Sequence, residues 1–498
     1  MLQNVTDVPS IKQKRGLNTA RDIFSLSPGE SPSCLNVVYD YDAFVGKRLG
    51  TSILSTARLS NASSSSGYGI FDFGIGSTPQ ERRLIAAVGT GYLYSSDVGR
   101  TFATCGTTRT TSMANFAFVK QYCIACNDAY DAPRYWTGSA ASVFQPLALN
   151  SAPTCKYPDS HQGYVFLLNE LNNRRSVYYE DENDMFSSDE WSHFQLPTER
   201  NDEICGSFHL RTAFYVYTKY KLFQLWFVGG NPDWTYREIK NWGFVPRTVK
   251  KIQIPDIGTE VVMGLDWSKR LRVFEGSKDY IISSNIEKDN GMTPFYMDNI
   301  NESQYLNCWA ENDAKQQKYR LFVPYGTDGE CAWSVVFDYR TGALYPENNR
   351  PFRCGTMVHD TADNMFMVGV TTNGYVHYLD SGNTDAGTAI NDYFISSFLF
   401  KGSPSVVNKN QRMDLFFSVR SSGTLNIEER NDFDSAWALN ESFTIVSGIS
   451  AVQTSKTIDI RNLSNVYQFK VSSSSNTADS WELNRFDYLG TSIGMGRA

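Results

Sequence analysis

The sequence predicts an all-β protein: a six- or seven-bladed β-propeller with an additional antiparallel β-sandwich and an extended N-terminal arm. Three observations support this fold class. Aromatic residues make up 14% of the 498 residues, and aromatic side chains favour strands over helices. Apolar runs occur in pairs that are separated by turn residues, as in β-hairpins. The pairs recur roughly every 40–55 residues, which is the interval expected of propeller blades.

The first segment, residues 1–60, is predicted to be an arm that carries one hairpin. It contains Pro28-Gly29 and Ser31-Pro32, and both dipeptides favour turns. The hairpin is expected in "LNVVYDYDAFVGKRLG". Because an arm of this kind has little core of its own, we expect it to dock on the C-terminal domain, on a neighbouring subunit or on an adaptor protein.

Residues 61–390 are predicted to form the propeller. Paired apolar runs with central turn residues lie in 83–96, 116–128, 164–181, 214–230, 261–283, 319–346 and 364–380. A radial array of such units leaves only short sheet edges, and a stacked pair of β-sandwiches is the competing architecture. The polar stretch "AENDAKQQKYR" (310–320) is expected to be a short helix or a loop.

Residues 391–498 show a different pattern and are predicted to form a separate sandwich. Longer alternating runs with Ser and Gly turns occur in "QRMDLFFSVRSSGTLNIEERND" and in "VYQFKVSSSSNTADSWELNRFDYLG". Alternation over this length is typical of antiparallel strands with one face on a core.

The stretch "LYSSDVGRTF" (93–102) places Ser95, Asp97, Gly99 and Thr101 at alternate positions, and Phe102 follows. This pattern resembles the Asp-box of propeller proteins. An aspartate can accept backbone N–H bonds across a turn, and a glycine supplies positive φ. We therefore expect a self-locking turn, with the aromatic ring between neighbouring sheets, and no catalytic role.

Composition excludes several functions. The formal net charge is −7, so nothing suggests the basic face that duplex binding requires. No apolar run is long enough to span a membrane. The N-terminus lacks the apolar core of a secretory signal, so the nine cysteines are expected to be reduced and buried, as in a cytoplasmic product.

No metal and no cofactor are expected. Cys123 and Cys126 form the only close cysteine pair, and the five histidines include no pair at i, i+4. A structural zinc site needs a second ligand pair at matching spacing.

No catalytic residue is predicted either. "GTSIG" (490–494) fits Gly-x-Ser-x-Gly, yet no acid or histidine follows it, as a hydrolase elbow requires. Asp338 with Glu347, and the run 180–182, offer carboxylates for glycoside hydrolysis, but acidic groups beside turns are usually solvated. The basic stretch "NWGFVPRTVKKIQIP" (241–255) is either a phosphate contact or, as we expect, a solvated loop.

The arm also resembles the opening of tail proteins from short-tailed bacteriophages. Its elements are Gly16-Leu17-Asn18, then the segment from Pro28-Gly29 to Asn36, and then the basic turn Lys47-Arg48-Leu49-Gly50. The segments "NDAYDAPRYWTG" (127–138) and "NRFDYLGTSIGMGRA" (484–498) are similar to further stretches of such chains.

This resemblance implies a tail nozzle, or tail hub, that contains a propeller and retains packaged DNA. It implies a structural virion protein without enzymatic activity, assembled in the bacterial cytoplasm as a ring of six copies. The partners would be portal-proximal adaptor proteins, tail fibres or tailspikes, and duplex DNA in transient contact with the lumen. The assembly residues would be Gly16, Leu17, Asn18, Pro28, Gly29, Asn36, Lys47, Arg48 and Gly50.

Two other functions remain open on the sequence. A propeller of this type can bind or cleave glycans in a sialidase-like manner, as a host-recognition component. It can also serve as an intracellular scaffold. The strand that carries the usual arginine of sialidases is missing, since "FVPRT" (244–248) does not match it.

Overall fold

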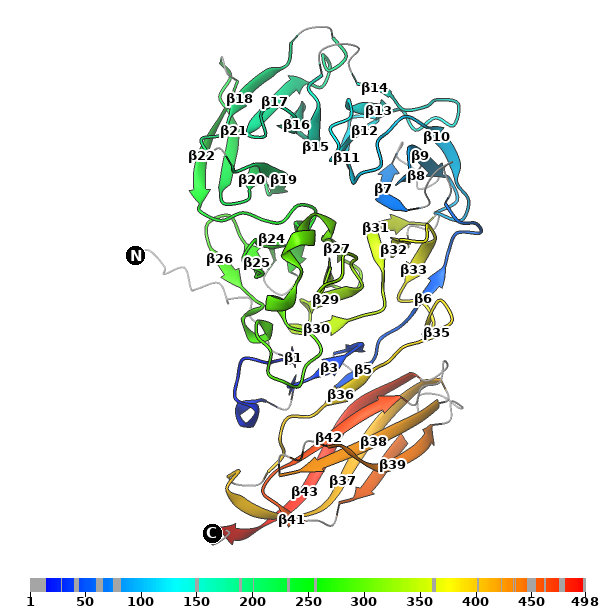
Figure 1. Ribbon diagram of the computed structural model, residues 1–498, viewed down its shortest axis with the longest axis vertical. Coiled ribbons are helices and arrows are strands. Elements are labelled where there is room, and N and C mark those ends of the chain that lie inside the picture. Colours follow the sequence, from blue (N-terminus) through cyan, green and yellow to red (C-terminus); the bar gives the residue numbers. More distant parts are fainter. Residues whose placement is uncertain are drawn as a thin grey trace.

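The computed structural model confirms the all-β fold class. It describes residues 15–27, 29–39, 44–59, 66–74, 82–147, 152–187, 190–199, 201–230, 233–254, 258–360, 364–400, 403–421, 423–432, 434, 436–445, 454–460, 463–473 and 480–495. Strands account for 55% of the residues and helices for 4%. Seven sheets of four or more strands surround a common centre, and a sandwich lies beside them (Figure 1).

Five blades are four-stranded antiparallel sheets formed by consecutive strands. Blades one and two contain β7 (Gly67–Gly74), β8 (Arg82–Val88), β9 (Gly91–Ser95) and β10 (Ala103–Gly106), then β11 (Ala114–Val119), β12 (Tyr122–Asn127), β13 (Arg134–Trp136) and β14 (Gln145–Pro146). Blade three contains β15 (Cys155–His161), β16 (Tyr164–Glu170), β17 (Ser176–Asp181) and β18 (Ser192–Gln195). Blades four and five contain β19 (Ile204–Leu210), β20 (Ala213–Thr218), β21 (Leu222–Phe227) and β22 (Trp234–Lys240), then β23 (Lys250–Ile254), β24 (Thr259–Leu265), β25 (Leu271–Phe274) and β26 (Asp279–Ile281).

The last two blades each include strands from the N-terminal arm. Blade six has β27 (Trp309–Asp313), β28 (Lys318–Val323), β29 (Trp333–Asp338) and β30 (Ala343–Glu347), extended by β1 (Arg15–Leu17) and β2 (Glu30–Ser31). Blade seven has β31 (Phe352–His359), β32 (Met365–Thr371) and β33 (Val376–Leu379), and then β6 (Thr51–Ile53), β34 (Thr384–Asp385) and β35 (Thr388–Ala389). The arm strand β6 therefore takes the fourth position of blade seven.

The blades pack through apolar layers between neighbours. In β8, Leu84, Ala86 and Val88 belong to the layer shared with blade seven, whereas Ile85 and Ala87 face blade two. Successive side chains of a strand point to opposite faces, so a strand covered on both faces reads as a continuous apolar run. The layer between blades seven and one closes the circle.

The C-terminal sandwich consists of two sheets. One contains β3 (Cys34–Leu35), β36 (Tyr393–Ile395), β42 (Tyr467–Ser473), β38 (Gly423–Asn431) and β39 (Ala438–Ile445). The other contains β4 (Val37–Val38), β5 (Val45–Lys47), β43 (Ser480–Met495), β37 (Val406–Ser421) and β40 (Thr454–Asp459), and β41 (Leu463–Ser464) pairs with β37. The arm thus contributes strands to both sheets of the sandwich as well as to two blades.

The prediction for residues 310–320 was wrong. The stretch is neither a helix nor a loop: β27 and β28 pair in register from Trp309↔Phe322 to Asp313↔Lys318. The sequence pattern gave the wrong prediction because polar residues of this stretch are buried in ion pairs and hydrogen bonds: Glu311, Asp313, Lys318 and Arg320. The helices of the described residues are short 3₁₀ turns: η1 (Ile23–Ser25), η4 (Ser284–Ile286), η5 (Met297–Asn299) and η6 (Glu302–Asn307).

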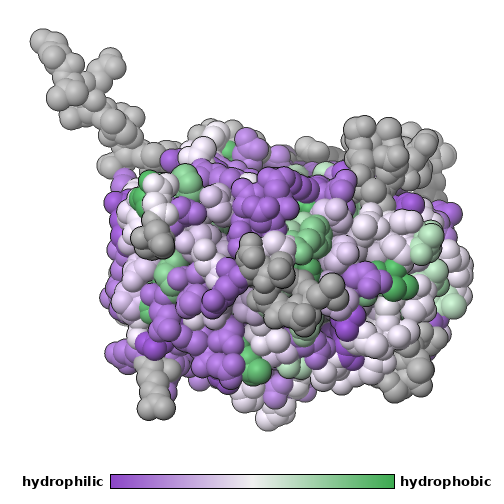
Figure 2. All heavy atoms as spheres, turned by 90° about the horizontal axis from the view of Figure 1, so that it is seen from above, coloured by the Kyte–Doolittle hydropathy of each residue, from purple (hydrophilic) through white to green (hydrophobic). Residues whose placement is uncertain are grey.

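The surface seen in Figure 2 is mostly hydrophilic, with hydrophobic groups in small separate patches. None of the helices within the described residues is long and apolar enough to cross a membrane.

Candidate functional site: the arm junction and the propeller axis

The first arm motif lies inside blade six. Gly16 has φ of +97°, and a Cβ there would lie 2.1 Å from the Leu344 carbonyl oxygen, so the position requires glycine. Leu17 and Asn18 are fully buried. The Asn18 side chain donates to the Glu30 carboxylate at 2.7 Å and accepts from the backbone N–H groups of Ala20 and Arg21. This motif fixes the arm where it enters the sheet.

The second and third motifs meet each other. Asn36 has φ of +53°, a conformation that asparagine tolerates better than most residues. Its side-chain oxygen accepts from Arg48 Nε at 2.9 Å, and its amide donates to Asn348 Oδ1 at 2.7 Å. Two parts of the arm, at Asn36 and at Arg48, therefore contact each other, and Asn36 also contacts Asn348 at the end of blade six.

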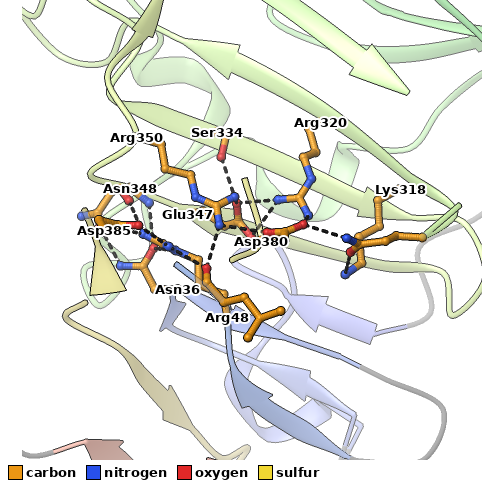
Figure 3. Close-up of polar contacts among 12 residues, drawn as sticks. Asn36, Arg48, Lys318, Arg320, Ser334, Glu347, Asn348, Arg350, Asp380 and Asp385 are labelled. Atoms are coloured by element: carbon orange, nitrogen blue, oxygen red, sulfur yellow. Dashed lines mark hydrogen bonds and ion pairs between the residues drawn. The ribbon is translucent and has the colours of Figure 1, made fainter. Parts of the chain in front are cut away.

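Arg48 is the centre of a buried polar cluster, which we call the arm junction: Asn36, Arg48, Arg320, Glu347, Asn348, Arg350, Asp380 and Asp385 (Figure 3). Arg48 forms a bidentate pair with Asp385, at 2.9 Å from Nη1 and 2.5 Å from Nη2. Its remaining N–H groups donate to the backbone oxygens of Leu49 and Asn348. All the guanidinium nitrogens of Arg48 thus have partners although its side chain is 0% exposed.

Two further arginines complete the arm junction. Arg350 donates to Glu347 at 2.6 Å, to Asp380 at 3.0 Å and to the Leu49 carbonyl at 2.8 Å. Arg320 pairs with Glu347 at 3.0 Å and also with Asp380. Three arginines, of which Arg48 comes from the arm, therefore face three carboxylates from blades six and seven, and the charges balance.

The electrostatics of the arm junction follow from this balance. Burial alone would raise the pKa of Glu347, but Arg350 and Arg320 outweigh it and lower the pKa. Burial would likewise raise the pKa of Asp380, but the neighbouring cations, chiefly Arg320, outweigh it and lower the pKa. Burial and the neighbouring Arg320 lower the pKa of Lys318 at the edge of the cluster. In a buried cluster of opposite charges such as this one, losing one partner is costly.

Lys47 links the arm to the C-terminal sandwich. Its ammonium lies 3.4 Å from Asp392, and both side chains are at most 1% exposed. Asp392 also accepts from Trp481 Nε1 at 2.7 Å and from Ser473. Burial outweighs Lys47 and raises the pKa of Asp392. Adjacent arm residues thus face opposite ways, Lys47 to the sandwich and Arg48 to the propeller.

The other predicted arm residues support the same path. A Cβ at Gly50 would lie 1.9 Å from the Thr384 carbonyl oxygen, so only glycine fits beside β34. The Gly29 carbonyl accepts from Gly16 N–H at 3.1 Å. Pro28 lies outside the described residues. Of the remaining eight arm residues, all but Gly29 are buried within their own chain, and their contact with partner molecules stays a prediction.

The Asp-box residues form a local turn between β9 and β10. Asp97 accepts from Ser95 Oγ at 2.6 Å, from Thr101 N–H at 2.8 Å and from Thr101 Oγ1 at 2.5 Å. Gly99 has φ of +95° and donates to Ser95 Oγ. Partial burial works against ionisation, but these hydrogen bonds lower the pKa of Asp97. Phe102 packs against the layer between blades seven and one.

The propeller axis contains a cavity of about 540 Å³ lined by the innermost strands of all seven blades. Phe116 and Phe118 contribute aromatic rings, and Asn115, Asp159, Ser207 and Glu311 contribute polar groups. The basic side chains that line it are ion-paired, Lys250 with Glu311 at 2.9 Å and Arg247 with Asp128 at 3.2 Å, and the Asp159 carboxylate accepts from Ser207 and lies 3.1 Å from His209. Because these charged groups are already bonded within the protein, the cavity suits a neutral polar occupant.

Two expectations about charged residues change in the structure. Arg247, expected in a solvated loop, is only 14% exposed in its side chain and borders the axial cavity. Glu347, considered as a glycosidase carboxylate, is held by two arginines, and Asp338 accepts from backbone N–H groups of a turn. Neither carboxylate faces a cavity described above, and the side chains of 490–494 lie outside the described residues.

Cys123 and Cys126 face opposite sides of β12. Cys123 lies in the layer between blades one and two, and Cys126 in the layer between blades two and three, because an odd separation on a strand reverses the face. All nine cysteines are free and buried. In the described part of the chain, no three His, Cys, Asp or Glu side chains gather in a metal-binding arrangement.

Sequence reasoning missed one polar group, at the edge of the axial cavity. Asp159 and His161 on β15 face Ser207 and His209 on β19, and the two histidine Nδ1 atoms are 3.1 Å apart. A search for histidines at helical spacing could not find it. The signal was the spacing i, i+2 in "DSH" and "SFH", which places each pair on one face of a strand.

No family model matches the sequence, and no curated protein matches it. Among solved structures, the chain is similar to the extracellular domain of a protein from B. thetaiotaomicron described as a hybrid two-component system (11% identity, TM-score 0.42, 82% of this chain and 47% of that one). It is also similar to BBS1N in complex with ARL6DN (10% identity, TM-score 0.40, 66% of this chain and 97% of that one). A glycoside hydrolase matches with a TM-score of 0.25 at 12% identity, over 83% of this chain and 96% of that one.

The chain spans about half the length of the first of these structures. With TM-scores of 0.42 or less, these similarities carry no argument about this chain. Function must therefore be inferred from the residues themselves.

Proposed function

We propose that this chain is a structural, ring-forming subunit of a short-tailed bacteriophage tail, a tail nozzle that retains packaged DNA and forms part of its exit channel. The observation that carries the proposal is the arm junction. The residues that resemble tail proteins, Asn36, Lys47, Arg48 and Gly50, are those that join the propeller to the sandwich. They have a structural role, as expected of a motif that defines a subunit shape.

The mechanism we propose is mechanical. Buried ion pairs on both sides of the arm make one rigid body from two domains, and a rigid body can transmit load around a ring. A cyclic ring requires heterologous contacts that close on themselves. The net charge of −7 suits a wall that DNA must pass without adhering.

The DNA channel in this proposal lies between subunits and not along the propeller axis. The axial cavity has a volume of about 540 Å³, which is the size of a small-molecule pocket. A DNA duplex is wider than its own major groove, which is about 12 Å wide. A cavity the size of a small-molecule pocket cannot hold it, so a duplex cannot pass through a single propeller. Only a ring of several copies can enclose it.

The experiment is mass measurement and electron microscopy of the purified chain, alone and with a portal-proximal adaptor from the same phage. The proposal predicts a closed ring with one fixed copy number. A chain that stays monomeric with the adaptor present would contradict it.

A deletion of residues 1–14 sharpens this test. It removes none of the described arm contacts, which begin at Arg15, so the subunit should remain folded. If the N-terminal segment contacts neighbours, ring assembly should be lost while the melting temperature is unchanged. Deleting residues 1–50 is the comparison, because it also removes Lys47 and Arg48 and should unfold the subunit.

The axial cavity favours a second candidate, a glycan-binding propeller for host recognition. Aromatic rings beside carboxylate, amide and hydroxyl groups are suited to a neutral sugar, and Phe118 is 46% exposed. Calorimetric titration with neutral oligosaccharides would detect binding that Phe118→Ala abolishes. Binding by a lasting monomer would favour this candidate over the nozzle.

A further inference from the structure

The group at the rim of the axial cavity has the geometry of a metal site with two protein ligands. His161 ends β15, the innermost strand of blade three, and His209 lies in β19, the innermost strand of blade four. The two Nδ1 atoms are 3.1 Å apart. This contact is a hydrogen bond between the two rings, in which one Nδ1 donates and the other accepts. Two nitrogens bound to one tetrahedral Zn²⁺ at about 2.0–2.1 Å lie roughly 3.3 Å apart, so an ion that replaces this hydrogen bond needs little separation of the two nitrogens, with both rings in the form that leaves Nδ1 unprotonated.

The other ring nitrogen of His209 has the partner that metal-binding histidines usually have. His209 Nε2 lies 3.1 Å from Asp159 Oδ1, and Ser207 donates to the second oxygen of the same carboxylate. If Nε2 carries the proton that this carboxylate accepts, Nδ1 of His209 presents its lone pair towards His161. An outer carboxylate of this kind fixes the tautomer and raises the basicity of the ligand.

The two rings are held in place by neighbouring aromatic residues. His161 stacks on Phe214 with a centroid distance of 5.2 Å and an interplanar angle of 18°, and Trp234 lies 5.8 Å away. His209 contacts the same Phe214 ring at 5.0 Å. Ligands that are already oriented lose little conformational freedom on binding.

The local charge and access also suit a cation. The carboxylate of Asp159 is the charge beside the pair. The His209 side chain is 33% exposed and Asp159 is 22% exposed, which leaves an entry path from solvent.

We propose that His161 and His209 bind a divalent transition-metal ion, preferentially Zn²⁺, through their Nδ1 atoms, with Asp159 as the outer partner of His209. Zn²⁺ prefers nitrogen ligands and tetrahedral geometry, and water would complete the coordination. With two protein ligands, where zinc sites usually have at least three, the affinity is expected to be moderate. The ion would connect blades three and four, and this inference is independent of the proposed tail function.

The direct test is calorimetric titration of the full chain with ZnCl₂ at pH 7, with MgCl₂ as the negative control. We expect one Zn²⁺ per chain and no response to Mg²⁺. His161→Ala and His209→Ala should abolish binding, and Asp159→Asn should weaken it about 10- to 100-fold, the usual effect of losing an outer partner. His193→Ala is the matched control, because His193 in β18 stacks on Tyr178 and should not change binding.

A second measurement needs no variant, in case the alanine variants do not fold. Modification of histidines with diethyl pyrocarbonate is mapped by mass spectrometry on the wild-type chain, with and without Zn²⁺. Zn²⁺ should protect His161 and His209 and leave His193 reactive. Absence of Zn²⁺ binding in the titration, binding that survives both alanine variants, or equal modification with and without Zn²⁺ would overturn the proposal.

Discussion

Two polar groups that stabilise the propeller, the Asp-box turn and the arm junction, differ in how far apart their residues lie in the sequence. The Asp-box turn of blade one is held by hydrogen bonds from Ser95 and Thr101 to Asp97, between residues that are two and four positions apart. The arm junction is held by Arg48 and Asp385, which are 337 residues apart. The Asp-box turn can form early and alone, whereas the arm junction exists only when the arm, blade six and blade seven are all in place.

The difference shows what each polar group contributes. Asp97 lies in a partly exposed turn, where water can replace a lost hydrogen bond. The carboxylates of the arm junction are buried, so each needs its arginine. We therefore expect unequal consequences when each group is disrupted.

The largest effect should come from Arg48→Ala. It leaves Asp385 buried without its bidentate partner, which should lower the free energy of unfolding by about 3–5 kcal/mol. Chemical denaturation followed by fluorescence measures this change. Arg100→Ala is the matched control, since Arg100 is exposed in the Asp-box turn, and it should change stability by less than about 0.5 kcal/mol. Equal effects of the two variants would remove the distinction.

A smaller effect is expected from Lys47→Met, on the sandwich side of the arm. Methionine fills the space, and Asp392, whose pKa is already raised by burial, can take up a proton when Lys47 is lost. We expect a loss of about 1–3 kcal/mol in the same denaturation experiment. A loss as large as that of Arg48→Ala would show that Asp392 stays charged.

Acid should weaken the two sides of the arm differently. The lowered pKa values of Glu347 and Asp380 contribute stability that is present above their unfolded pKa values, near pH 4, and is lost as pH falls through the folded ones. The pKa of Asp392 is raised instead of lowered. Protonation of Asp392 therefore favours the folded state, and its contribution to stability is not lost as pH falls. Unfolding measured from pH 6 to pH 3 should therefore show a loss of stability that is reduced in Glu347→Gln.

The smallest effect should come from Asp97→Ala. The variant loses the turn hydrogen bonds in a partly exposed position, which should cost about 1 kcal/mol and lower the melting temperature slightly. Ring assembly, if the proposed function is right, should be unchanged. Loss of assembly without loss of stability would assign a functional role to the Asp-box.

The same distinction explains how much could be predicted from the sequence. The turns at Gly89, Lys120 and Gly374 lie between strands that pair directly, because hairpin signals are local. The Asp-box turn was predictable for the same reason. The motif Lys47-Arg48 was noticed, but its partners Asp392 and Asp385 lie far along the chain, and no local pattern links them.

Other features were hidden by burial of polar residues. Residues 310–320 contain enough charge to resemble a loop, yet they form a hairpin because blade six buries their ion pairs. Trp226, which lies in an apolar run, is 39% exposed at the end of β21. His161 and His209 come from different blades, so only the fold brings them together.

Hydrogen exchange followed by mass spectrometry on Arg48→Ala, beside Asp97→Ala, tests the central claim most directly. If the arm holds the two domains as one body, Arg48→Ala should raise exchange together in the arm strands, in blades six and seven and in the sandwich strand β36. Asp97→Ala should raise it only around β9 and β10. Increased exchange confined to the arm in Arg48→Ala, with unchanged protection in both domains, would contradict the account.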